Sequence, residues 1–337
     1  MKQTIIALAI LLGCISPASA IDNNTVEVVY SGTTATVTVA DNISSYVTVS
    51  SDTSADVVIS QSNTAAVDDD EITYVLSGST NEGSFKLSGS YKCTVSLAGV
   101  SITNSDGPAL NILNGKRIKI SAKKETTNTL TGAGTSSYNG CIYCKGHIEF
   151  QGNGELNIVG TAYHAVKAKE YVQIKNLTLN ITSATKDGIN CKEYFWMKSG
   201  TVTISGVGSD GIDVSMDGTT STGEITATDT IDAHDDEDSG NFYQDGGTLT
   251  ITLASSNTTG SLIQADGTIA HNGGTYNGTS YETAIRTIDY VPFNDGECTI
   301  YDLQGRKIVH GTSVNSTSKK GLYIINRNNK TTKVLVK

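Results

Sequence analysis

Short runs of alternating apolar and polar residues recur along most of the chain, and in its middle they repeat at a fixed step. Leu156–Ile158 is followed 23 residues later by Leu179–Ile181, and after a further 23 residues by Val202–Ile204. Alternation with a period of two is typical of a strand that buries one face. A fixed step in the twenties is typical of stacked, repetitive folds. The pattern therefore predicts a β-solenoid with coils of about 23 residues.

Two companion segments follow the same step. His164–Ala168 corresponds to Asp187–Cys191 and to Asp210–Val214, and Tyr171–Lys175 corresponds to Tyr194–Lys198. Turn-forming residues separate the three segments of each unit. Three short strands per repeat predict an all-β fold, and we expect its main domain to be a right-handed parallel β-helix with three strands per coil.

The start and the end of this pattern divide the chain into four regions. Residues 1–20 combine a polar, positively charged start with an apolar run and an Ala-Ser-Ala cleavage site, as secretory signal peptides do. Residues 21–92 alternate strongly and are expected to form an N-terminal β cap over the open end of the solenoid. Residues 93–282 are the predicted β-helix. Residues 283–337, where the period is lost, are expected to form a small C-terminal β unit.

The repeat also separates buried side chains from outward-facing ones. Alternation places Tyr171 beside Tyr194, and Gln173 beside Trp196, on the exposed phase of one set of strands; Trp196 is the sole tryptophan. A flat aromatic face with a polar edge suits sugar binding. These four residues are therefore the candidate carbohydrate-binding residues. The alternative is that they pack beneath a loop such as residues 235–238.

A second outward column carries charged residues. Asp213 is expected to lie beside Asp232, because Asp229–Ala233 matches Asp210–Val214 at a step of 19 residues. Carboxylates opposite each other destabilise a sheet, and a calcium ion, which takes oxygen ligands, would remove that cost. Ordinary Asp-Gly turn chemistry is the alternative for Asp210. The candidate metal ligands are Asp210, Asp213, Asp229, Asp232, Asp235 and Asp236.

Lys167 is the basic member of this column, which it shares with Asn190, Asp213 and Asp232. We interpret it as an exposed lysine that supports solubility. The alternative is the base of a lyase, because removing the proton next to a uronate carboxylate needs a base near the carbon and a metal on the carboxylate.

The charge balance limits the partners. A formal net charge of −10 argues against nucleic acid and anionic membranes, both of which attract basic surfaces. Neutral sugars, cations and anions held through bridging cations remain. The acidic run Asp68–Glu71 is interpreted as a solvated loop. After the predicted signal peptide, no apolar run reaches the roughly 20 residues that a membrane-spanning helix needs.

The cysteines do not indicate a disulfide framework or a functional site. After cleavage the chain keeps an odd number of cysteines, so at least one thiol is free or pairs with another chain. Cys144 and Cys191 lie two coils apart, and a coil rises by about 4.8 Å, which is too far for a disulfide. They are interpreted as small buried hydrophobic residues. The sequence leaves open the thiol state of Cys93, Cys141 and Cys298, and whether Cys14, in the signal peptide, belongs to a lipoprotein signal.

Several motifs together resemble a known family. They are Thr126–Leu130, Tyr163–Val166, the two Asp-Gly-Ile triplets, and Asp235–Ser239 followed by Gly246–Ile251. In these motifs the chain resembles secreted bacterial carbohydrate-binding β-helix proteins, a family with a pectate-lyase-like fold. The resemblance covers about residues 25–275. It implies binding of cellulose or acidic pectic polysaccharide, with calcium bound. Thr230 stands where that family usually keeps glycine, which leaves transfer of its calcium site open.

The tail resembles a different module. Tyr301–Lys307, Lys320–Ile324 and Lys333–Lys337 are similar to segments of the C-terminal sorting domain of type IX secretion cargo. This resemblance implies export across both membranes with the help of type IX-like secretion machinery. The mature protein would then be extracellular or held at the outer cell surface.

Three functions are therefore open. The first is an exported, monomeric, non-catalytic protein that binds plant-type or acidic polysaccharide. The second is a calcium-dependent pectate lyase, and the third is a structural surface or adhesion protein without a sugar ligand.

Overall fold

The computed structural model describes residues 21–50, 54–216 and 239–281, together with the backbone of short strands between residues 285 and 336. Within these residues the fold is all-β, and its helical element is one 3-10 turn, η1 (Asp41–Ile43). The described part of the chain contains no helix that is long and apolar enough to cross a membrane.

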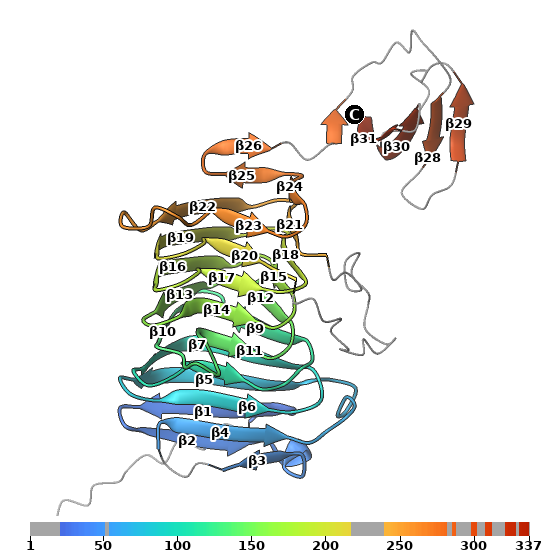
Figure 1. The fold of residues 1–337 in the computed structure, drawn as a ribbon. Coiled ribbons are helices and arrows are strands. Elements are labelled where there is room, and N and C mark those ends of the chain that lie inside the picture. Colours follow the sequence, from blue (N-terminus) through green and yellow to red (C-terminus); the bar gives the residue numbers. More distant parts are fainter. Residues whose placement is uncertain are drawn as a thin grey trace, which may run out of the picture.

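Parallel pairing stacks the chain into coils, and each strand hydrogen-bonds to its counterpart one coil further along (Figure 1). The first ladder is a nine-stranded sheet. In spatial order, its strands are β3 (Val47–Val49), β4 (Asp56–Gln61), β6 (Ser84–Ser88), β8 (Leu110–Ile112), β11 (Gly140–Cys144), β14 (His164–Ala168), β17 (Ile189–Cys191), β20 (Ile212–Val214) and β23 (Ile263–Ala265).

The second ladder supplies the next strand of each coil. The long strand β7 (Cys93–Asn104) belongs to two ladders. Its first half pairs with β9 (Ile118–Ala122) and its second half with β10 (Thr127–Gly132). The strands of the second ladder are β5 (Ile72–Thr80), β7 (Cys93–Asn104), β9 (Ile118–Ala122), β12 (Ile148–Gly152), β15 (Val172–Ile174), β18 (Tyr194–Met197), β21 (Asn241–Gln244) and β24 (Ile269–His271).

The third ladder completes each coil, and antiparallel strands flank the stack at both ends. β2 pairs with β1, β3 with β4, and β26 with β25, all antiparallel. Such strands cover edges that would otherwise offer unpaired backbone groups. The strands are β1 (Thr25–Ser31), β2 (Thr34–Val39), β10 (Thr127–Gly132), β13 (Glu155–Gly160), β16 (Thr178–Ala184), β19 (Thr201–Val207), β22 (Thr248–Leu253), β25 (Gly274–Tyr276) and β26 (Thr279–Tyr281).

The register of the central coils confirms the repeat predicted from the sequence. In the third ladder Leu179 pairs with Leu156 on one side and Val202 on the other. In the first ladder Ile189 lies between Val166 and Ile212. Because the side-chain period of a strand is two, this register stacks like residues above like residues on the same face.

The inward phase forms one continuous apolar core along the stack. Its aromatic members stack from coil to coil; the Phe195 and Phe242 rings lie 5.1 Å apart and nearly parallel. The thiols join this core as the sequence predicts for Cys144 and Cys191. Among the described side chains, the cysteines Cys93, Cys141, Cys144 and Cys191 are all free and buried.

The parallel pairing begins earlier than residue 93, where the sequence pattern places the start of the β-helix. β1 pairs in parallel with β5, and β4 pairs in parallel with β6. Both pairs lie within residues 21–92, the region assigned to a cap. Strand alternation is the same in a cap and in a coil, so the sequence pattern does not separate them.

The prediction that Asp232 lies beside Asp213 is wrong. In the first ladder Asp213 pairs with Asn190 on one side and Gln264 on the other. The match of Asp229–Ala233 to Asp210–Val214 is therefore not the next coil. The first ladder resumes at β23, after β21 has joined the second ladder and β22 the third.

The C-terminal region forms a separate five-stranded sheet. It includes an antiparallel hairpin of β28 and β29 and the antiparallel pair β30–β31. The sheet contains β27 (Ile285–Thr287), β28 (Cys298–Tyr301), β29 (Lys307–Gly311), β30 (Gly321–Arg327) and β31 (Lys330–Val336).

Several sequence predictions fall outside the described residues. They are the signal peptide over residues 1–20 with Cys14, the loop 235–238, and the side chains of Asp229, Asp232, Asp235, Asp236 and Cys298.

Candidate functional site

A column of polar side chains crosses the outward face of the first ladder. We call it the polar column. It begins near the N-terminal end of the stack and continues over seven successive strands. Its members, paired in register, are Lys86, Asn111, Tyr143, Lys167, Asn190, Asp213 and Gln264.

Hydrogen bonds link the centre of the polar column. The Lys167 Nζ donates to Asn190 Oδ1. The Asn190 amide in turn donates to Asp187 Oδ2 at 2.8 Å and to Asp213 Oδ2 at 2.5 Å. The register of these residues is as predicted, and the asparagine bridges the lysine and the two carboxylates.

Lys167 is only 5% exposed, so the prediction of an exposed, solubilising lysine is wrong. The neighbouring strands place Tyr143 on one side of Lys167 and Asn190 on the other, and both are themselves buried. Burial, reinforced by the nearby positive charges of Lys192 and Lys169, lowers the pKa of Lys167 to about 8. An amine with that pKa is partly neutral near physiological pH and can accept a proton.

Two aspartates, Asp187 and Asp210, lie beside the polar column close to its member Asp213. His164 Nδ1 lies 3.0 Å from Asp187 Oδ2, and the Asp210 amide donates to Asp187 Oδ1 at 3.0 Å. Burial acts to raise the pKa of Asp187, but His164, Asn190 and the Asp210 amide outweigh it and hold that pKa at about 2. Burial and the charges of Asp187 and Asp210 raise the pKa of Asp213. This corner of the face therefore concentrates negative charge.

A row of lysines borders the polar column at the ends of three consecutive strands. We call it the lysine row. Lys145 follows β11, Lys169 follows β14 and Lys192 follows β17. Lys145 and Lys169 are exposed, and Lys192 Nζ lies 3.4 Å from Ser215 Oγ. These lysines were not chosen as candidates from the sequence, although they recur in step with the repeat, directly after Cys144, Ala168 and Cys191.

The predicted aromatic platform lies on the outward face of the second ladder, but it is not exposed. Tyr171 and Tyr194 stack as predicted, with ring centroids 4.7 Å apart. The exposed fractions are 3% for Tyr171, 0% for Tyr194, 8% for Trp196 and 7% for Gln173. The prediction of exposure is therefore wrong. Bulky rings on adjacent strands cover one another, which alternation alone does not reveal.

Two protein groups already contact the parts of Trp196 that a sugar would use, which are the ring face and the indole N–H. The Lys198 ammonium lies over the indole ring, 3.8 Å from its centroid. The indole N–H donates to Asp245 Oδ2 at 2.8 Å. A sugar that stacked on this ring would have to displace Lys198. The alternative of packing beneath a loop fits the burial, although the loop that was named lies outside the described residues.

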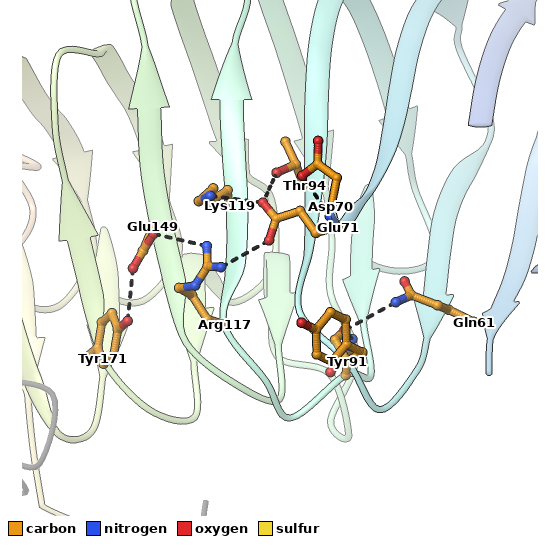
Figure 2. A network of polar contacts seen from close by, with 10 residues as sticks. Gln61, Asp70, Glu71, Tyr91, Thr94, Arg117, Lys119, Glu149 and Tyr171 are labelled. Carbon is orange, nitrogen blue, oxygen red and sulfur yellow. Dashed lines mark hydrogen bonds and ion pairs between the residues drawn. The ribbon is translucent and has the colours of Figure 1, made fainter. Parts of the chain in front are cut away.

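The same face carries an ion-pair network toward the N-terminal end, and Figure 2 shows its arrangement across the strands. Arg117 contacts Glu71 at 3.0 Å and Glu149 at 3.5 Å, and Tyr171 Oη donates to Glu149 at 3.1 Å. Lys119 contacts Glu71 at 2.9 Å. Burial acts to raise the pKa of Glu71, but these cations lower it below its usual value. The Asp68–Glu71 run is therefore not wholly a solvated loop.

Comparisons with known proteins identify the family of the chain and a solved structure with a similar fold. The sequence model of the family described as carbohydrate-binding domain-containing protein matches residues 61–257. The fold is similar to that of the polysaccharide lyase-like protein from C. thermocellum, solved as a gadolinium derivative, with a TM-score of 0.53 and 18% identity. That similarity covers 75% of this chain and 99% of the other. No curated protein matches the sequence.

Proposed function

We propose that this chain, which belongs to the family of carbohydrate-binding domain-containing proteins, binds an acidic polysaccharide across the outward face of the first ladder. The observation that carries the proposal is the lysine row, which places cations at the same position of three consecutive coils. Coils repeat about every 4.8 Å. A straight line of cations suits a linear polymer whose sugars carry carboxylates.

The charge of the whole molecule makes this row distinctive. The chain has a formal net charge of −10, so it repels polyanions on average. Exposed Lys145 and Lys169 would provide local attraction, and ammonium–carboxylate contacts are strengthened when they act as a set. The neighbouring amides and hydroxyls of the polar column would supply hydrogen bonds to the sugar hydroxyls.

The aspartates beside the row fit the calcium ion that the family resemblance implies. Burial, together with the like charges of Asp187 and Asp210, raises the pKa of Asp213, and oxygen donors of this kind suit calcium. Asp210 and Asp213 would hold the ion, which would bridge to a sugar carboxylate. Asp213→Asn is then expected to weaken the calcium dependence of polysaccharide binding.

Affinity electrophoresis in gels that contain polygalacturonate tests the proposal. The double variant Lys145→Ala/Lys169→Ala removes two exposed contacts, and we expect it to bind about fivefold to tenfold more weakly. Lys175→Ala is the matched control, because Lys175 is also exposed but lies at the turn between β15 and β16. Equal retardation of the double variant and the wild type would refute the role of the lysine row.

A second function is favoured by the burial of Lys167 against Asn190, which lowers the pKa of its amine. In a lyase, Lys167 Nζ would take the proton next to the uronate carboxylate, the carbon–carbon double bond would form, and the glycosidic oxygen would leave and become protonated. Absorbance of the unsaturated product tests this reaction. Lys167→Met abolishes product formation if Lys167 is the base, and a wild-type protein that binds polygalacturonate without product is non-catalytic.

We also propose that the coils turn in a right-handed sense and that the protein is exported. Right-handed connections between parallel strands hold in about 98% of cases, which supports the handedness. The N-terminal segment and the sheet of β27–β31 support export through their sequence resemblance. Fractionation of cells that express tagged full-length protein tests this, and retention of the protein in the cytoplasm would refute it.

A further inference from the structure

Three side chains meet at one corner of the stack, where the chain passes from the first ladder to the second. His147 directly precedes β12, and Glu193 directly precedes β18. Glu170 lies on the intervening coil, two residues before β15. Neither the polar column nor the ion-pair network of Figure 2 includes these three residues.

The potential ligand atoms of these residues are close together and shielded from solvent. One ligand atom from each residue lies within 4.8 Å of the other two. His147 Nε2 contacts Glu170 Oε2 and lies 3.5 Å from Glu193 Oε2. The exposed fractions of the three side chains are 11% for His147 and 10% for each glutamate. Among the described residues, no other set of three His, Cys, Asp or Glu side chains has this geometry.

An unsatisfied oxygen points into the cluster. Glu170 is 8% exposed, and its buried Oε2 has no hydrogen-bond partner although it lies against the imidazole. A buried carboxylate without a full set of partners is costly. A second buried carboxylate on the next coil adds like-charge repulsion, and one imidazole offers at most a single positive charge. A divalent cation would balance both carboxylates and use the unsatisfied oxygen.

Packing fixes the direction of the imidazole. The His147 ring stacks on Tyr171 with centroids 4.3 Å apart and a 10° angle between the planes, and Tyr171 stacks on Tyr194. The ring plane is therefore held by the same aromatic column that was predicted as a sugar platform. Its Nε2 edge faces the two glutamates, as a metal ligand requires, and positioning by neighbours is typical of such ligands.

The donor set selects the kind of metal. Imidazole nitrogen with two carboxylate oxygens suits zinc and related first-row metals, whereas calcium takes six to eight oxygens. Ligands about 2.05 Å from a tetrahedral zinc lie roughly 3.4 Å apart, close to the 3.5 Å between His147 and Glu193. Three protein ligands leave a fourth position for water or a ligand group.

We propose that His147, Glu170 and Glu193 form a binding site for one divalent first-row transition-metal ion of the zinc type. The site is distinct from the calcium site implied at the aspartates, and it does not depend on polysaccharide binding. Its position beside the aromatic column suggests that metal binding fixes the corner between the two ladders.

Zinc and cobalt titrations of the full chain after metal removal test this proposal. Calorimetry is expected to show one zinc bound per chain. Trp196 is the sole tryptophan and belongs to the aromatic cluster of Tyr171 and Tyr194, so bound Co²⁺ is expected to quench its fluorescence. Zinc should then reverse the quenching, because both metals compete for one site.

Variants locate the site. Losing a group that only orients a ligand typically costs about 10–100-fold in metal affinity. His147→Asn and Glu170→Gln remove ligands themselves, so each is expected to weaken zinc binding by about 100-fold or more. His271→Asn and Glu155→Gln are the matched controls and should bind zinc as the wild type does. Circular dichroism without metal confirms that each variant is folded.

Three results would overturn the proposal. They are the absence of stoichiometric zinc binding, zinc binding that survives both ligand substitutions, and equal loss in the control variants. The first would mean that direct contacts between His147 and the glutamates hold the cluster without a metal. The second and third would mean that zinc binds adventitiously elsewhere.

Discussion

Lys167 shows at the scale of one residue how a solenoid changes the chemistry of its side chains. Its position in the polar column follows from the repeat, but its burial does not. Alternation tells which face a residue occupies and not how tall its neighbours are. Tyr143 on one side and Asn190 on the other are themselves nearly buried. The same reason explains why Tyr171, Tyr194 and Trp196 were placed correctly and yet predicted to be exposed.

The lowered pKa of Lys167 predicts a specific dependence of stability on pH. The folded pKa is about 8 and the ordinary value for lysine is 10.5, so between these values the unfolded chain binds more protons than the folded one. The free energy of unfolding therefore increases as the pH rises through this window. Lys167 contributes about 3 kcal/mol to this increase at most. Urea unfolding of wild type and Lys167→Met at pH 7 and pH 10.5 measures this gain.

Lys175→Met controls for the general effect of losing a lysine. Because Lys175 is exposed, its substitution should leave the pH profile unchanged. An identical change of stability with pH in wild type and Lys167→Met would contradict the assigned burial.

Asp187 also predicts that stability rises with pH, but in a window on the acid side. Its folded pKa, about 2, lies below the ordinary value of 3.8, so its stabilising effect is complete above pH 3.8 and is lost as the pH falls toward 2. Asp187→Asn is therefore expected to destabilise the protein at pH 7 by about 2 kcal/mol. That deficit should shrink at pH 2.5 in the same urea assay. A deficit that does not depend on pH would mean that shape, and not charge, makes Asp187 important.

Among the strands and turns, the repeated Asp-Gly-Ile triplets have a packing role that the sequence does not reveal. Their Asp-Gly pairs suggest ordinary turns, but the glycines are needed for space. A Cβ on Gly211 would lie 2.4 Å from the Leu262 carbonyl oxygen and 2.4 Å from Ile251 Cγ2. Gly188 meets Gly211 O at 2.6 Å in the same way. Neighbouring coils therefore approach too closely at these glycines to admit a side chain.

Gly211→Ala is expected to destabilise the fold by about 1–3 kcal/mol, because backbone of the next coil must shift to accept the methyl group. Gly115→Ala is the matched control, since nothing lies within 4 Å of its added Cβ. Thermal unfolding of the two variants makes the comparison. Equal stability of both variants would show that the coils separate easily at Gly211.

Over the whole molecule, the sequence predicts some coils and not others, and the two outcomes have different physical reasons. Regular coils could be placed because a register of 23 residues leaves the same residue types on the same face. The coil after β20 could not, because Asp210 meets Ser261 across a sequence separation of 51 residues. Asp229–Ala233 resembles Asp210–Val214 at a step of 19 residues, so the sequence pattern mistook it for the next repeat. The glutamates of the cluster lie in a repeated triplet, since Lys169-Glu170-Tyr171 recurs as Lys192-Glu193-Tyr194. The cluster was missed because His147 stands at the tyrosine position one coil earlier, stacked on Tyr171, where the repeat shows no glutamate.

Charge distribution over the molecule predicts how binding depends on salt. The lysine row attracts a polyanion to a chain whose net charge is −10, and exposed charges are screened when the Debye length shortens from about 10 Å at 0.1 M to about 3 Å at 1 M salt. Retardation in polygalacturonate gels should therefore fall steeply with sodium chloride. Retardation that is the same at both salt concentrations would argue against lysine contacts.

The most direct test of the proposed binding face is to map where a short oligogalacturonate joins the protein. Zero-length carbodiimide coupling links its carboxylates to adjacent lysine amines, and mass spectrometry of the digest identifies those lysines. We predict coupling at Lys145, Lys169 and Lys192, which excess free oligogalacturonate suppresses, and little coupling at Lys175. Coupling spread evenly over exposed lysines, or concentrated away from the first ladder, would contradict the account.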